Sequence, residues 1–133
     1  MPYVPTAGDT PYDRLGHDTI LALAERFYVH MDESEPALAQ LHQLDAQGRV
    51  HPEMRARFAL FLVGWLGGPQ DYSARHGHPR LRMRHAKVVV DEVMRDAWVR
   101  CMGLAMDDAG VDGELRTFLD QRFLEVADFL RNV

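Results

Sequence analysis

HPRLRMRHA, residues 78–86, is the stretch of the chain on which the interpretation of the rest depends. It carries three arginines at alternate positions, with His78 and His85 beside them, in a chain whose formal net charge is −5. The surrounding window from Tyr72 to Val90 holds five of the 15 Lys and Arg residues and none of the 20 Asp and Glu residues. Because attraction to phosphates depends on the field of the whole surface, one basic island on an acidic protein indicates one or two local anionic groups rather than a nucleic acid.

Helical geometry separates the residues of this stretch. Positions two apart on a helix point about 200° apart, so the three arginines do not share a face, whereas Leu81 and His85, four apart, do. A short helix from Pro79 to about His85 would direct an apolar residue and a histidine inward and guanidinium groups outward. This arrangement suits a ligand with an apolar body, a metal and carboxylate edges, and haem is such a ligand. From the spacing alone, a core histidine with satisfied hydrogen bonds stays the alternative.

The hydrophobic periodicity is helical almost throughout, and we expect an all-α domain of about four main helices and some short ones. Caps and glycines set the expected bounds. The predicted helices are His17–Met31, broken by Asp32–Ser34; Ala37 to about His42, capped by Ser34; Pro52 to the stop at Gly67-Gly68-Pro69; a helix capped by Asp91 and running to about Ala109; and a last helix capped by Asp112. The predicted loops are Gln43–His51 and Gln70–Gly77.

The bulk properties describe one ordinary globular domain. A chain of 133 residues with 47% hydrophobic residues buries one core, and we expect residues 1–10 to be a loosely ordered extension. The longest apolar run, FALFLVGWL at 58–66, is too short to span a membrane. The single cysteine, Cys101, forms no internal disulfide. This suits a reducing cytoplasm, and we expect a cytoplasmic protein without a nucleic-acid or membrane partner.

Other chemistries find little support in the sequence. We see no P-loop, dinucleotide or metalloprotease motif, and the pair His76 and His78 has no second pair with which to form a zinc site. Cys101 falls on the buried side of a predicted helix, where cysteine is normally inert. Tyr28 and Trp98 are different, because each lies on an apolar stripe yet carries a polar atom that needs a partner when buried. Either each reaches a neighbouring carbonyl, or both face something polar in a pocket.

Four segments taken together resemble the group II truncated haemoglobins. They are RFY (26–28), FLVGWLGGP (61–69), YSARHGHPRLRMRHA (72–86) and RDAWVRCM (95–102). The resemblance extends from Pro11 to the last helix, and HPRLRMRH followed by RDAWVRCM is its most specific part. It implies a single truncated globin domain with a shortened globin fold, a two-over-two helical sandwich around haem b.

The resemblance also implies roles for individual residues. His85 matches the proximal ligand of the haem iron, and Tyr28 and Trp98 match distal residues that donate hydrogen bonds to a bound ligand. The residues expected at the haem propionates are Arg84, Arg57, Tyr72 and His78. The residues expected to line the haem pocket are Phe27, Met54, Phe58, Phe61, Leu62, Leu81, Met83 and Met102.

The chain departs from the family pattern at three places. Gly16-His17 stands where two glycines are common, and Lys87-Val88 stands where a proline and a phenylalanine often follow the proximal histidine. The loop before Pro52 is longer than usual, so the third distal position falls on His42 only by an alignment that this loop can shift. His42 is then either a third donor in the pocket, a sixth iron ligand there when no gas is bound, or a surface histidine that ends a short helix.

The implied function is reversible binding of dioxygen and other diatomic gases. Donors fixed in a low-dielectric pocket stabilise the partial charge on bound dioxygen by about one to a few kcal/mol each. Since ~1.4 kcal/mol is tenfold in affinity, two donors predict slow release, which argues against simple oxygen transport. The alternatives are a redox enzyme on the same haem, for nitric oxide dioxygenation or peroxide chemistry with an unidentified reductase, and, more remotely, a haem-free helical module that binds an acidic partner. The chain is expected to be a monomer or a homodimer.

Overall fold

The computed structural model describes residues 1–133 apart from the side chains of Arg82 and Arg84. Over this part the chain is helical, with two isolated β-bridges and no strand. The helices are α1 (Pro11–Leu15), α2 (His17–Ser34), α3 (Pro36–Ala39), α4 (Pro52–Trp65), α5 (Asp71–His76), α6 (Leu81–His85), α7 (Glu92–Asp108) and α8 (Gly113–Leu130). The all-α prediction is therefore confirmed. Within the described residues, no helix combines the length and the apolar character that crossing a bilayer requires.

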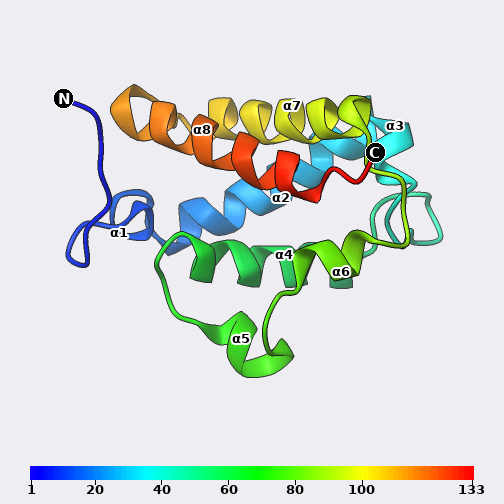
Figure 1. The fold of residues 1–133 in the computed structure, drawn as a ribbon, viewed down its shortest axis with the longest axis horizontal. Helices are drawn as coiled ribbons and strands as arrows, with labels where there is room; N and C mark the ends of the chain where they lie inside the picture. Colours follow the sequence, from blue (N-terminus) through cyan, green and yellow to red (C-terminus); the bar gives the residue numbers. More distant parts are fainter.

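The four long helices pack as two pairs. α2 contacts α4 and α7, and α7 also contacts α8. Figure 1 shows α7 and α8 together in the upper layer, with α2 and α4 below them and the short α5 and α6 beside α4. The core between the pairs is almost wholly apolar, and its largest fully buried side chains are Phe27, Phe123, Ile20, Leu23, Met31, Leu62, Met102, Met106, Leu119, Val50 and Cys101.

Two glycines let α1 pack closely on the end of α4. The backbone N–H of Tyr12 donates to the Leu66 carbonyl at 2.9 Å. Gly67 has φ +106°, and a Cβ at Gly68 would lie 2.4 Å from the Tyr12 ring, so neither position accommodates a side chain without strain. The predicted stop of this helix at its glycines is confirmed, because α4 ends at Trp65.

The predicted break after Met31 is wrong, since α2 continues to Ser34. An aspartate side chain can compete with the helix backbone for hydrogen bonds. The Asp32 carboxylate instead accepts a hydrogen bond from the Val50 N–H at 3.0 Å and pairs with Arg55. The predicted cap of the following short helix is also wrong, because Ser34 still belongs to α2.

The short helix itself begins one residue earlier than predicted and is shorter. Glu35 holds the N-cap position of α3, without a side-chain capping bond, and Pro36 opens the helix. Regular α-helix ends at Ala39, although the His42 N–H still donates to the Ala39 carbonyl at 3.0 Å in a tight turn. The predicted loop over Gln43–His51 is confirmed, and it holds the isolated bridge between residues 44 and 50.

The second predicted loop, Gln70–Gly77, is wrong because it contains α5. Only one residue of α5 is buried, Tyr72 with 5% of its surface exposed, and its ring meets that of Phe61 with the centroids 5.7 Å apart. A helix fixed by one buried residue has no apolar stripe, so hydrophobic periodicity does not reveal it. Gly77, with φ +73°, ends the helix.

The two aspartates predicted as caps differ from each other. Asp91 caps α7, as predicted, by accepting the Met94 N–H at 2.9 Å. Asp112 occupies the N-cap position of α8, but its side chain makes no capping hydrogen bond.

The segment before α1 contacts the last helix. Tyr3 is buried, its ring stands edge-on to Phe118 with centroids 5.1 Å apart, and its hydroxyl donates to the Asp9 carbonyl at 2.8 Å. Sequence patterning gave no sign of this contact, and the loose order of residues 1–10 stays a prediction.

Candidate functional site

The predicted iron ligand, His85, ends α6 and is half-buried. Its Nδ1 lies 2.7 Å from the carbonyl oxygen of Leu81. Because a carbonyl only accepts hydrogen bonds, Nδ1 must carry the hydrogen. The neutral ring then keeps a lone pair on Nε2, and a backbone carbonyl that holds the other ring nitrogen is a common arrangement around metal-binding histidines.

Asn132, near the C-terminus, fastens the segment that follows His85. Its backbone N–H donates to the Val90 carbonyl at 2.8 Å, and its side-chain oxygen accepts the Val90 N–H at 2.9 Å. Its side-chain nitrogen donates to the carbonyls of Val88, at 2.8 Å, and of His85, at 3.4 Å. The sequence did not predict this role of Asn132, because nothing local marks a contact that spans 47 positions.

Four aromatic rings from three helices form one cluster. α2 supplies Phe27 and Tyr28, α4 supplies Phe58, and α7 supplies Trp98. The centroid distances are 5.6 Å between Tyr28 and Phe58, 5.2 Å between Phe27 and Trp98, and 6.4 Å between Phe58 and Trp98. The two polar aromatics that sequence analysis singled out therefore lie in one cluster, with Phe58 in contact with both.

Tyr28 is a protonated donor at neutral pH. Only 4% of its surface is exposed, and this burial raises the pKa of its hydroxyl, against a smaller opposing effect of the Arg55 charge. In the described part of the chain, no hydrogen bond uses this hydroxyl, and no fully enclosed side-chain nitrogen or oxygen lacks a partner. The hydroxyl therefore reaches accessible space, where it can donate to a ligand.

His42 lies beside Tyr28, with the ring centroids 5.9 Å apart and the planes at 87°. Its Nδ1 donates to the Leu38 carbonyl at 3.0 Å. Burial is the main cause that lowers the pKa of His42, and the charge of His85 acts in the same direction. His42 is therefore neutral at pH 7, with a lone pair on Nε2.

The residues predicted at the propionates lie around Phe61 as far as their side chains are described. Arg57 precedes Phe61 by one turn of α4, is half-buried, and forms no ion pair with the described residues. Tyr72 packs on the Phe61 ring, and His78 borders the same cavity as Phe61. The side chain of Arg84 lies outside the described residues.

A cavity of about 330 Å³ opens between α4, α6 and α8. Its volume is in the range of small-molecule sites. Three predicted pocket residues border it: Phe61 and Leu81 are half-buried, and Met83 is 63% exposed at its rim. The other predicted pocket residues lie further inside, in or against the core: Phe27, Met54, Phe58, Leu62 and Met102.

Cys101 does not take part in this chemistry. The residue is buried, and burial raises the pKa of its thiol to about 12. A thiol that stays protonated at neutral pH is a poor nucleophile.

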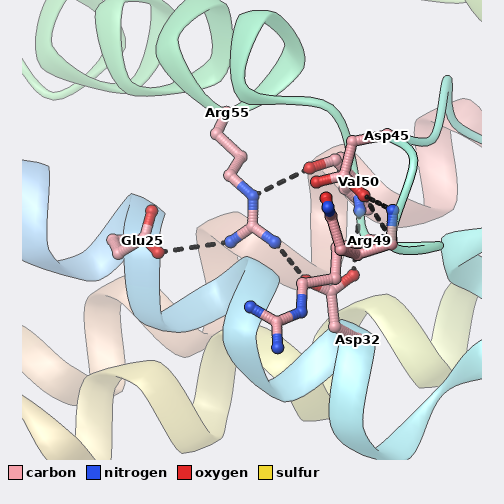
Figure 2. A network of polar contacts seen from close by, with 7 residues as sticks. Glu25, Asp32, Asp45, Arg49, Val50 and Arg55 are labelled. Carbon is pink, nitrogen blue, oxygen red and sulfur yellow. Dashed lines mark hydrogen bonds and ion pairs between the residues drawn. The ribbon is translucent and has the colours of Figure 1, made fainter.

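An ion-pair network that the sequence did not predict lies beside Tyr28, and Figure 2 shows it. Arg55 donates to the Val50 carbonyl at 3.0 Å and to Glu25 at 3.3 Å, and it pairs with Asp32. The sequence does contain one sign of this network. Arg55 lies three residues before Phe58 on the apolar stripe of α4, where a charged side chain is unusual.

Four helices packed two over two, with a cluster of polar and apolar aromatics in the core and a histidine and an apolar cavity at α6, are the arrangement of a haem-binding globin. The chain belongs to the bacterial-like globin family, whose model matches residues 10–132. Within that family it is similar to the group II truncated haemoglobins, as the sequence predicted. A group 2 truncated haemoglobin of Bacillus subtilis is 35% identical over 111 residues, which cover 84% of this chain and 80% of the relative.

Solved structures agree with this assignment. The cold-adapted truncated haemoglobin of Pseudoalteromonas haloplanktis is 39% identical with a TM-score of 0.84, over 93% of this chain and 98% of that one. The group II truncated haemoglobin of Bacillus anthracis is 33% identical with a TM-score of 0.83, over 93% and 97% of the two chains. The truncated oxygen-avid haemoglobin of B. subtilis is 35% identical with a TM-score of 0.82, over 92% and 99%. The two-over-two prediction is therefore confirmed. The ring nitrogen of His85, the Tyr28 hydroxyl and the apolar cavity fit haem as a group.

Proposed function

We propose that this protein binds dioxygen and other diatomic gases reversibly on haem b, with His85 as the proximal ligand. The observation that carries the proposal is the hydrogen bond from the His85 Nδ1 to the Leu81 carbonyl, at 2.7 Å. It fixes the ring in the tautomer whose Nε2 is free to bind a metal. The haem, when bound, supplies an iron atom that holds the gas and gives it partial negative charge.

Tyr28 and Trp98 are the proposed distal donors. Both belong to one aromatic cluster, which holds their rings in place without using the Tyr28 hydroxyl. A donor held in a buried, low-dielectric site needs little reorganisation when charge appears beside it. We therefore expect slow dioxygen release, and a relative from B. subtilis is itself described as oxygen-avid.

Arg57, Arg84, Tyr72 and His78 are the proposed partners of the propionates. Arginine suits carboxylates because its planar fork donates two parallel hydrogen bonds. Arg57 is suited to this role, since no carboxylate among the described residues holds its guanidinium group.

Of the two pocket roles predicted for His42, we propose that of sixth iron ligand when no gas is bound, and its hydrogen bond to Leu38 supports this choice. The hydrogen bond to Leu38 occupies its one N–H while the ring is neutral, so Nε2 accepts or coordinates rather than donates. His42 as a donor requires the other tautomer and the loss of that bond.

The test of the proposed function is an absorption spectrum. Purified protein should be red, with a Soret band that shifts when carbon monoxide is added. His85→Gly should lose haem, and added imidazole should restore the spectrum by replacing the missing ring. Colourless protein that takes up no haem would overturn the proposal, as would a His85→Gly variant with an unchanged spectrum.

The same donors favour a second candidate, a redox reaction of the held gas. A protein that releases dioxygen slowly keeps it available for a second reactant, such as nitric oxide. An unidentified reductase would then return the oxidised iron to its ferrous state. The single cysteine supports a reducing cytoplasm as the location. Turnover of nitric oxide with a reductant distinguishes this candidate from simple binding.

A further inference from the structure

The proposed donor Tyr28 has a charged residue against the face of its ring. The guanidinium carbon of Arg55, on α4, lies 5.5 Å from the centroid of the Tyr28 ring, on α2. A guanidinium group at this distance is attracted to the negative face of the ring. The contact joins the two helices that carry Tyr28 and Phe58.

Arg55 is itself held on several sides. As Figure 2 shows, it reaches the Val50 carbonyl, Glu25 and Asp32. Asp32 in turn accepts the Val50 N–H at 3.0 Å. The ion pair therefore binds both the backbone N–H and the backbone carbonyl of Val50, a loop residue. The side chains of Arg55 and Asp32 are only 15% and 11% exposed, which makes this a rigid and largely desolvated pair.

We propose that Arg55 is a positioning residue for Tyr28: the Asp32 carboxylate and Val50 fix its guanidinium group against the phenol ring, and this contact sets how fast a bound gas leaves. The inference rests on the proposed function. Arg55 acts in two ways. It keeps the ring from turning away from the ligand, and its charge draws electron density from the ring, which makes the hydroxyl a stronger donor.

A purely stabilising role explains this pair less well. Two buried charges lose their hydration, and replacing such a pair by apolar residues is often neutral or stabilising. The chain has a comparable arginine elsewhere, Arg116, whose side chain is 22% exposed and pairs with Asp107 and Asp120. Arg116 also donates to the Val111 carbonyl at 3.1 Å, and it lies where α7 turns into α8, at the other end of the molecule from the loop before α4 (Figure 1). It therefore serves as a matched control.

The experiment measures the dioxygen dissociation rate of haem-loaded protein for Arg55→Met, Arg55→Lys, Tyr28→Phe and the double variant Arg55→Met/Tyr28→Phe. Arg55→Met should speed dissociation by roughly 3- to 30-fold. Arg55→Lys keeps the charge without the fork, so it should recover part of the loss. In the double variant the rate should equal that of Tyr28→Phe, because Arg55 acts through that hydroxyl. The carbon monoxide stretching frequency should rise in Arg55→Met as the donor weakens.

The control variant Arg116→Met should lower the unfolding temperature but leave the dissociation rate unchanged. A rate for Arg55→Met equal to that of the control would overturn the proposal, and so would full additivity with Tyr28→Phe. A second readout needs no haem: in the haem-free protein, Arg55→Met should shift the NMR signals of the Tyr28 ring and speed exchange of the Val50 amide. Unchanged signals there overturn the inference, whereas failure of the protein to bind haem overturns only the proposed function.

Discussion

The ring of His42 stands edge-on to the ring of Tyr28, with the two centroids 5.9 Å apart. Burial of this histidine lowers its pKa below the usual 6.5, so the folded protein resists its protonation. A group whose pKa is lower in the folded state stabilises the fold only above its unfolded pKa. That stability is lost as the pH falls through 6.5 towards the folded value.

The first prediction is therefore that wild type loses stability relative to His42→Gln as the pH falls from about 7.5 to about 5. Glutamine keeps a side-chain donor for the Leu38 carbonyl but does not titrate. Thermal unfolding of both proteins across this pH range measures the difference in their stability. The other histidines titrate in both proteins, so their effect cancels in this difference. Parallel curves for the two proteins would mean that His42 is exposed to solvent.

The second prediction concerns the two proposed donors. Tyr28→Phe keeps the ring contacts with Phe58 but removes the hydroxyl, and Trp98→Leu removes the indole nitrogen. Each should speed dioxygen dissociation by about 5- to 30-fold, which corresponds to ~1–2 kcal/mol for a buried hydrogen bond. Stopped-flow replacement of dioxygen by carbon monoxide measures these rates. If neither substitution changes the rate, the bound gas does not face this aromatic cluster.

The third prediction tests the contact between α1 and the end of α4. A Cβ at Gly68 would lie 2.4 Å from the Tyr12 ring, so Gly68→Ala should destabilise the protein by about 1–3 kcal/mol. The matched control is Gly103→Ala, where the nearest atom lies at 3.8 Å and the residue is inside a helix. This change should be neutral or slightly stabilising, since alanine is the better helix former. Urea unfolding compares them, and equal midpoints would show that Tyr12 moves aside without strain.

The sequence predicted those features that have a local signal. The spacing of Leu81 and His85 placed them within one helical turn, as α6 does, and Tyr28 stood out because its polar atom falls on an apolar stripe. The roles of His85 and Tyr28 at haem came from the family resemblance and stay predictions. The long helices followed from their periodicity, since each buries a continuous face. Such features depend on residues three or four positions apart, which a single sequence displays directly.

What the sequence did not predict depends on contacts between distant positions. Arg55 pairs with Asp32 across 23 positions, and Asp32 lies in the part of α2 where a break was expected. α5 was missed because one residue, Tyr72, fixes it against α4. Neither arrangement has a period or a motif, so only the packed fold brings the partners together.

The last prediction concerns Asn132. Its side-chain nitrogen donates to the carbonyls of Val88 and His85, and its side-chain oxygen accepts the Val90 N–H. Asn132→Asp keeps the acceptor and loses both donors, and Asn132→Ala loses all three bonds. Each bond contributes about 0.5–1.5 kcal/mol.

Because the lost bonds hold the backbone around the proposed iron ligand, haem should dissociate faster in the order wild type, Asn132→Asp, Asn132→Ala. We expect an acceleration of several-fold for the alanine variant, measured by transfer of haem to an excess of apomyoglobin. Arg131→Ala, one position earlier, is the control, since it removes an ion pair with Glu92 at the surface. Equal haem loss in all four proteins would mean that the segment from His85 to Val90 keeps its place without the Asn132 side chain.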